Sequence, residues 1–249
     1  MIADILTVAW KELREMLMFG DTRGRSRLSL LALLVIFGVV IPLQNGREWV
    51  ISPISAMIWA WMPYMWVYSV VADSFAGERE RHTLEALLAT RLSDRAILFG
   101  KLLAALAYGF TLTWAILLVS LITVNAAVQG RDVLLFSPMV TLGALVFSIL
   151  VSGLSANIGI LVSLRASSVR QAQQWMSFGV LILFLPLMLI RFIPAAWLKT
   201  IGNAVIHANP LQIGFWTAVG LIMIETVLLV IAMRLFQRSK LILDEYPSK

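Results

Sequence analysis

Six long stretches without a charged side chain limit what this chain can fold into. No Asp, Glu, Lys or Arg occurs in residues 28–46, 49–72, 102–130, 133–164, 171–190 and 200–224. About 20 helical residues cross the hydrocarbon core of a bilayer, so each stretch could reach across it. Hydrophobic residues make up 60% of the chain and charged residues 14%, which excludes an ordinary water-soluble domain.

The membrane spans are predicted to be helices. Backbone N–H and C=O groups must be paired within lipid, and the uncharged stretches lack the alternation of barrel strands. The last stretch stops at Glu225, but apolar residues resume after it, so one helix is predicted from about Leu211 to Phe236. We therefore predict an all-α polytopic membrane protein with a single domain, 1–249, in which 28–236 forms six transmembrane helices. The spans are expected near 28–43, 51–72, 96–124, 133–163, 175–193 and 211–236.

The distribution of basic residues predicts the orientation. Sixteen of the 20 Lys and Arg lie in segments 1–28, 73–101, 164–174 and 234–249, which fall on one side of a six-span bundle. Because basic residues collect on the cytoplasmic side, both termini are predicted to be cytoplasmic, including the tail 237–249. This orientation accounts for the pI of about 10.1, so no nucleic-acid partner is expected.

Residues 1–27 are predicted to form a cytoplasmic amphipathic helix. Ile2, Leu6 and Trp10 recur at helical spacing, while Lys11 and Glu12 lie on the other face. Such a helix lies along the membrane surface, and we expect Trp10 at headgroup depth.

The loop after the second span carries the most specific pattern. A charged stretch leads into a short amphipathic helix with Leu84, Leu87 and Leu88 on one side, and a new helix follows that is capped by Ser93 or Asp94. Such a helix between two spans offers a small rigid knob to a cytosolic partner. The pattern by itself equally allows a solvated loop whose leucines rest on the membrane.

This loop resembles the signature loop of ABC type-2 (ABC-2) transporter permeases. The segment Lys11-Glu12-Leu13 and the stretch 167–174 agree with weaker patterns of the same family, whereas Arg91 stands where the family usually has proline. The residues that carry the loop resemblance are Glu78, Glu80, Thr83, Leu84, Glu85, Leu87, Leu88, Leu92, Ser93, Ile97, Leu98, Gly100 and Lys101.

The resemblance implies a division of labour. Two ATPase subunits would bind ATP and Mg, and this chain, which binds no cofactor itself, would pair with a second copy or a related permease to export a substrate. The expected location is the plasma membrane of a prokaryote; the substrate and the choice of homodimer or heterodimer stay open. The implied ATPase-coupling residues are Glu78, Glu80, Arg81, Thr83, Leu84, Glu85, Leu87 and Leu88, with Lys11 and Glu12 of the first helix.

The chain carries no recognisable ATPase motif of its own. Gly100-Lys101 does not belong to a phosphate loop, because Arg95 stands where the earlier glycine is needed and Leu102 follows the lysine. The two histidines, His82 and His207, are far apart in sequence and no cysteine is present, so no metal site is expected. Energy for transport must then come from another subunit.

Two alternatives remain at this stage. Glu225 lies near the middle of the last span, where an ionised carboxylate is costly, so it is a candidate functional residue and favours an ion-coupled secondary transporter as the first alternative. A protonated or hydrogen-bonded glutamate between helices is the simpler interpretation. The remote alternative is an intramembrane serine protease that uses Ser155 and His207, although Ala156 stands where a glycine is expected.

Overall fold

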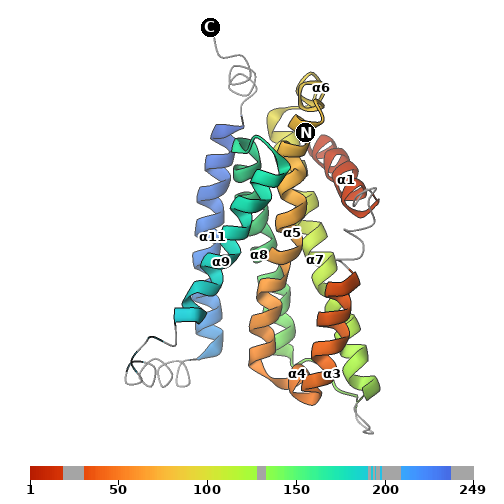
Figure 1. The fold of residues 1–249 in the computed structure, drawn as a ribbon, viewed down its shortest axis with the longest axis vertical. Coiled ribbons are helices and arrows are strands. Elements are labelled where there is room, and N and C mark those ends of the chain that lie inside the picture. The colour runs from red at the N-terminus through yellow and green to blue at the C-terminus, as the bar shows by residue number, and fades with distance from the viewer. Residues whose placement is uncertain are drawn as a thin grey trace.

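The computed structural model describes residues 1–18, 31–127, 133–189, 192, 194, 197 and 209–236. These residues are almost entirely helical and contain no strand, which confirms the predicted all-α class. The long helices run roughly parallel to the long axis of the molecule, and short helices lie at both ends (Figure 1). Their bounds are α1 Ile2–Met18, the π-helical segment η1 Ile36–Val40, α3 Ile41–Asn45, α4 Arg47–Ile51, α5 Pro53–Glu80, α6 Leu84–Leu88, α7 Asp94–Ala127, α8 Pro138–Arg165, α9 Val169–Leu189 and α11 Pro210–Leu235.

Three helices among the described residues are long and apolar enough to cross a membrane. They are Asp94–Ala127, Pro138–Arg165 and Leu211–Leu235. They coincide with the predicted third, fourth and sixth spans, and a shorter apolar helix, Leu31–Asn45, occupies the predicted first. The full count of six spans stays a prediction.

Small residues on α8 let the neighbouring helices approach closely. A methyl group at Gly159 would lie 2.7 Å from Val71 Cγ1 of α5, and one at Gly109 of α7 would lie 2.6 Å from Ser152 Oγ. In a lipid environment, close packing of small residues replaces the hydrophobic effect as the main attraction between helices. The buried small residues of α8 are Ala144, Ser148, Ser152, Gly153, Ser155, Ala156, Gly159 and Ser163.

The aromatic residues of α5 mostly face other helices. Trp59 and Trp66 are buried, and Trp59 contacts the Trp49 ring edge-on with the ring centroids 5.4 Å apart. Trp61 is exposed. The buried rings of α5 therefore pack within the bundle.

α5 is longer than the sequence predicted. It was expected to end near residue 72 but continues to Glu80, because its charged residues are paired with other elements. The chain leaves the helix at His82, two residues after Glu80, and the His82 φ of 55° lies in the left-handed region. His82 N–H donates to Arg79 O at 3.1 Å and Thr83 N–H donates to Glu78 O at 2.9 Å, the hydrogen bonds of a Schellman motif. The next long helix begins at Asp94, and Ser93 Oγ accepts from Ala96 N–H at 3.2 Å, which confirms the predicted cap.

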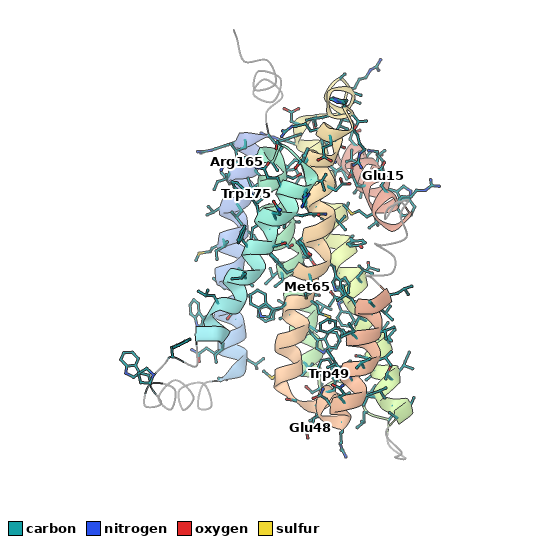
Figure 2. All side chains as sticks on the ribbon, viewed as in Figure 1. Glu15, Glu48, Trp49, Met65, Arg165 and Trp175 are labelled. Carbon is teal, nitrogen blue, oxygen red and sulfur yellow. The ribbon has the colours of Figure 1, made fainter. Side chains whose placement is uncertain are left out.

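The two ends of the bundle carry different segments. α1, α6, the α8–α9 turn and the last turn of α11 lie at one end, whereas α3 and α4 lie at the other (Figure 1). Glu15 and Arg165 lie toward the first end, Glu48 lies at the second, and Met65 lies between them (Figure 2). The described segments that are rich in basic residues therefore share one end of the molecule.

Candidate functional site

The predicted knob is the short helix α6, between the ends of α5 and α7 (Figure 1). Leu84, at its start, is 5% exposed and belongs to a core cluster with Phe75, Ile97 and Leu98. Leu87 packs partly against the same cluster. These contacts attach α6 to the bundle, so it cannot shift without disturbing α5 and α7.

The outer side of the knob is polar and basic. Arg81 NH2 lies 3.0 Å from Asp73 Oδ2, and the pair passes over Gly77, where any side chain would collide with both. The side chains of Glu85 and Leu88 lie outside the described residues. We define the knob surface as the exposed residues Arg81, His82, Thr83, Ala86, Ala89, Thr90 and Arg91.

A buried ion cluster lies beneath the knob. Lys101 is 2% exposed, and its Nζ donates to Glu12 Oε1 at 3.0 Å, Glu78 Oε1 at 2.9 Å and Ser74 O at 3.1 Å. All three ammonium hydrogens therefore have acceptors. The Lys101 ammonium also lies 4.9 Å from the centroid of the Phe75 ring. This ion cluster joins α1, α5 and α7 at one point.

Among its buried groups, the ion cluster has more negative than positive charge. Two carboxylates share the single buried ammonium, and Lys11 Nζ approaches Glu12 Oε1 at 3.5 Å from a half-exposed position. Burial raises the pKa of the Glu78 carboxyl above its ordinary value, although the charge of Lys101 lowers it. Glu12 and Glu78 thus lie inside the chain, where they position α1 against α5 and α7.

α1 packs closely against α7 at Gly100. Val8 and Ala9 are buried, and a methyl group at Gly100 would lie 2.5 Å from Val8 Cγ1. The predicted N-terminal helix is confirmed over Ile2–Met18. Only some of its apolar residues face the bundle, since Ile2, Leu6 and Trp10 are exposed.

Sequence reasoning missed the contacts between α5 and the α8–α9 turn. Ser163 Oγ accepts from the backbone N–H groups of Phe75 at 3.0 Å and Ala76 at 2.8 Å, and it donates to Ala72 O at 3.0 Å. Ser163 is fully buried. No local pattern indicated this contact, because it joins residues about 90 positions apart.

Two charged residues of α5 complete this connection. Arg79 donates to Ala166 O at 2.6 Å and to Leu164 O at 3.1 Å, so it caps the end of α8. Glu80 Oε1 accepts from Val169 N–H at 2.9 Å, at the start of α9. We call Ser163, Arg79 and Glu80 the α5 clamp. Glu80 was predicted to contact a partner, and the structure places one of its carboxylate oxygens on α9.

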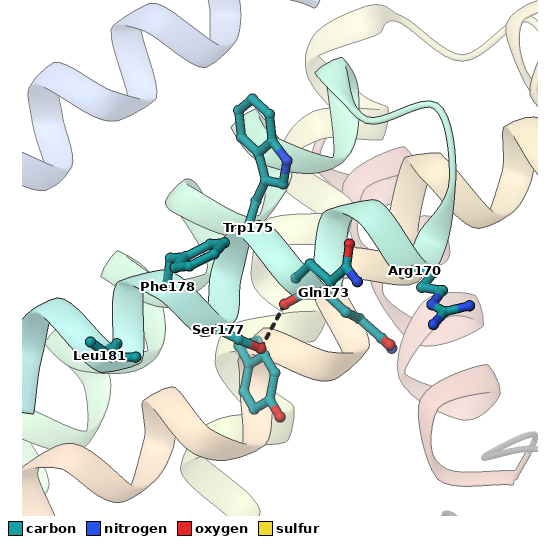
Figure 3. Close-up of a pocket in the computed structure, with 8 residues that line it drawn as sticks. Arg170, Gln173, Trp175, Ser177, Phe178 and Leu181 are labelled. Atoms are coloured by element: carbon teal, nitrogen blue, oxygen red, sulfur yellow. Dashed lines mark hydrogen bonds between the residues drawn. The ribbon is translucent and has the colours of Figure 1, made fainter.

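A groove follows α9 beside Tyr68 of α5 (Figure 3). It is open and has a volume of about 680 Å³. Its lining changes from polar residues at the first turns of α9 to apolar residues farther along, in the order Arg170, Gln173, Gln174, Trp175, Ser177, Phe178 and Leu181. Such a lining suits a molecule with both polar and apolar parts.

The remaining candidate residues are Glu225, Ser155 and His207. Glu225 is half-buried beside Gly153 of α8, where its Oε2 would lie 2.9 Å from an added methyl group. Ser155 is fully buried and its Oγ has no hydrogen-bond partner among the described residues, while His207 lies outside them. In the described part of the chain, no three His, Asp or Glu side chains could hold a metal ion.

Comparison with known proteins identifies the family. Residues 52–241 match the family model described as ABC-2 family transporter protein. The chain belongs to the ABC-2 transporter family. The matched region contains α6, the α5 clamp and the groove, and it starts after α1. Membership makes the chain a multi-pass plasma-membrane protein.

A named relative agrees with this assignment. The chain is 34% identical over 152 residues to the ABC transporter permease protein NatB of Bacillus subtilis (strain 168). The match covers 55% of this chain and 38% of the relative, so the chain corresponds to little more than a third of that protein's length. Family membership accounts for the loop after α5, which neither the ion-coupled transporter nor the serine protease explains.

Proposed function

We propose that this chain is a permease subunit that forms the translocation pathway of an ABC exporter. Two permease subunits, identical or related, would line the pathway, and two separate ATPase subunits would bind ATP and Mg. The knob surface would seat on the ATPase. The observation that carries this proposal is the attachment of α6, since a short exposed helix is fixed by Leu84 to two long helices.

Rigidity is what this role requires. Closure of two ATPases can move membrane helices only if a stiff element connects them, because a flexible loop would absorb the displacement. α5 runs without interruption from Pro53 to Glu80, and α7 starts at Asp94, so the knob joins both helices through short connections.

The predicted coupling residues fall into two groups, those that could contact the ATPase directly and those that hold the knob in place. Exposed Glu80, Arg81 and Thr83 are candidates for direct contact, and Glu85 and Leu88 remain so on the family pattern. The half-exposed Lys11 lies beside the ion cluster. The residues that support the knob from within are Glu12, Glu78, Leu84 and, in part, Leu87.

We place the pathway along the groove between α5 and α9. Its polar start and apolar continuation suit a substrate that is partly apolar. A second permease subunit facing this groove would close it into a channel.

The test is a steric substitution on the knob. Ala86 is exposed on α6, so Ala86→Arg adds bulk and charge to the proposed contact without removing an internal one. Tagged wild-type chain, purified from its native host in mild detergent, should bring a stoichiometric ATPase subunit with measurable ATP hydrolysis. Ala86→Arg should lose that subunit. The matched control Gln44→Arg, exposed at the opposite end of the bundle, should retain it.

A wild-type chain that purifies without any ATPase would overturn the proposal. In that case Glu225→Gln, tested for loss of ion-driven transport, would examine the first alternative.

A further inference from the structure

We infer that Arg79 and Ser163 are positioning residues that carry the motion of the knob to α9. The inference rests on the proposed function and extends it from α6 to the wall of the groove. The link is the α5 clamp, whose hydrogen bonds hold the knob end of α5 to the α8–α9 turn.

Arg79 fixes the turn from one side. Its guanidinium donates to two backbone carbonyls at the end of α8, Leu164 O and Ala166 O. Carbonyls in the last turn of a helix lack intrahelical partners, and a charged donor there is stabilising. A planar fork that bonds two carbonyls restrains orientation as well as distance, which a single ammonium contact cannot do.

Ser163 fixes α5 from within the bundle. Its hydroxyl bonds two N–H groups and one carbonyl of α5, Phe75 N, Ala76 N and Ala72 O. A side chain that inserts into the hydrogen-bond ladder of a helix is a recognised cause of bending. Ser163 contacts α5 at residues 72–76, between the predicted membrane span of α5 and the knob. A bend of α5 at this level would change the angle between these two parts.

The start of α9 is tied to the same end of α5. Val169 N–H donates to Glu80, and a small apolar cluster packs the two helices together just inside. The members of that cluster are Ala72, Ala76, Ala166, Ala172 and Met176, with Met176 1% exposed. Tyr64 OH adds a hydrogen bond to Met176 O at 3.2 Å.

The groove begins immediately beyond these contacts. Arg170 is the residue after Val169, and the lining continues along α9 to Leu181. A displacement of the knob end of α5 would therefore move the polar end of the groove through the clamp. The α8–α9 turn would act as a second branch of the coupling path, beside the direct route along α5 and α7.

The absence of cysteine makes a distance measurement possible. The chain contains none, so introduced cysteines are the only thiols that it offers to a spin label. Ala86 on α6, Gln174 on α9 and Leu118 on α7 are exposed, and Leu118 lies away from the knob. In the complex with its ATPase, the Ala86–Leu118 pair reports motion of the knob, and the Gln174–Leu118 pair reports motion of α9.

Both distances should change when ATP and Mg are added to the wild-type complex. In the double variant Arg79→Ala, Ser163→Ala, the Ala86–Leu118 change should persist and the Gln174–Leu118 change should become smaller, because Glu80 and the apolar cluster still join α5 to α9. The matched control Arg95→Ala removes an exposed arginine from the first turn of α7 and should keep both changes.

The possible failures are distinguishable. An α9 response that stays at the wild-type size in the double variant overturns the clamp inference, and so does a wild-type complex in which only the knob moves. If the wild-type knob does not respond to ATP, the proposed function itself fails. Should the double variant not assemble, Arg79→Lys keeps the charge without the fork; it should reduce the α9 response, and a full response would overturn the inference.

Discussion

Lys101 lies where three helices meet, and its burial depends on the groups that pair with its ammonium. Burying an ammonium group is costly unless its charge and all its hydrogens are satisfied. Glu12 and Glu78 supply the charge, and Ser74 O accepts the third hydrogen. The side chains of Lys101, Glu12 and Glu78 are only 1%, 8% and 11% exposed, so solvent screens the cluster weakly.

Replacing the buried lysine should destabilise the chain strongly. Lys101→Met removes the ion-pair partner of the buried Glu78 and leaves Glu12 only the half-exposed Lys11, and we expect a loss of about 3–5 kcal/mol in the free energy of unfolding. Thermal unfolding in detergent, followed by circular dichroism, would measure it. The matched control Lys11→Met removes a half-exposed lysine from the same site and should cost less than about 1 kcal/mol.

A double variant separates charge from packing. Adding Glu78→Gln to Lys101→Met removes the carboxylate that lost its ion-pair partner and should recover part of the lost stability. An unchanged melting temperature in Lys101→Met would contradict the assigned role of the ion cluster.

At the scale of elements, α1 is attached to the bundle by shape as well as charge. Val8 fits against Gly100, one residue before the lysine of the ion cluster. Val8 occupies the space that a side chain at position 100 would need, so this contact sets the distance between α1 and α7. α1 lies outside the region that matches the family model.

A side chain added at Gly100 should displace α1. Gly100→Ala places a methyl group 2.5 Å from Val8 Cγ1, and we expect a loss of about 1–3 kcal/mol from overpacking. Thermal unfolding in detergent again provides the measurement. Val8→Ala combined with Gly100→Ala should restore part of the stability, because it shortens the opposing side chain.

A glycine in open space provides the control. A methyl group at Gly214 meets nothing within 4 Å, so Gly214→Ala should change stability by less than about 1 kcal/mol. Equal effects at Gly100 and Gly214 would show that α1 is not held by this contact.

At the scale of the whole molecule, the bundle has one basic end and one end with few charges. The described basic segments share the end that carries α1 and α6 (Figure 1). Basic residues collect on the cytoplasmic side of membrane proteins, so this end is predicted to face the cytoplasm, where an ATPase could reach the knob surface.

Cysteine labelling in cells would test this orientation. Ala3 on α1 and Gln44 on α3 are both exposed, and the predicted first span lies between them. Gln44→Cys should react with a membrane-impermeant maleimide in intact cells, whereas Ala3→Cys should react only after permeabilisation. Wild-type chain, which has no cysteine, is the blank. Equal labelling of both positions in intact cells would mean that no span separates them.

The sequence by itself determined the fold class, the long membrane helices and the position of the knob. These depend on local properties: runs without charge, helical spacing of leucines, and the Ser93 cap, which the structure confirms. The resemblance of the loop around Glu78 and Leu84 also identified the family that the comparison establishes.

Only the tertiary structure decided which polar residues face inward. Glu12 and Glu78 looked like members of a contact surface, but both are buried and accept hydrogen bonds from Lys101, which is 89 and 23 positions away. Likewise, Ser163 and Arg79 gave no local signal. Their partners are backbone groups about 90 positions away, and such pairings arise only when α5, α8 and α9 pack together. Periodicity gives the face of a helix on which a residue lies, whereas helix packing decides what that face meets.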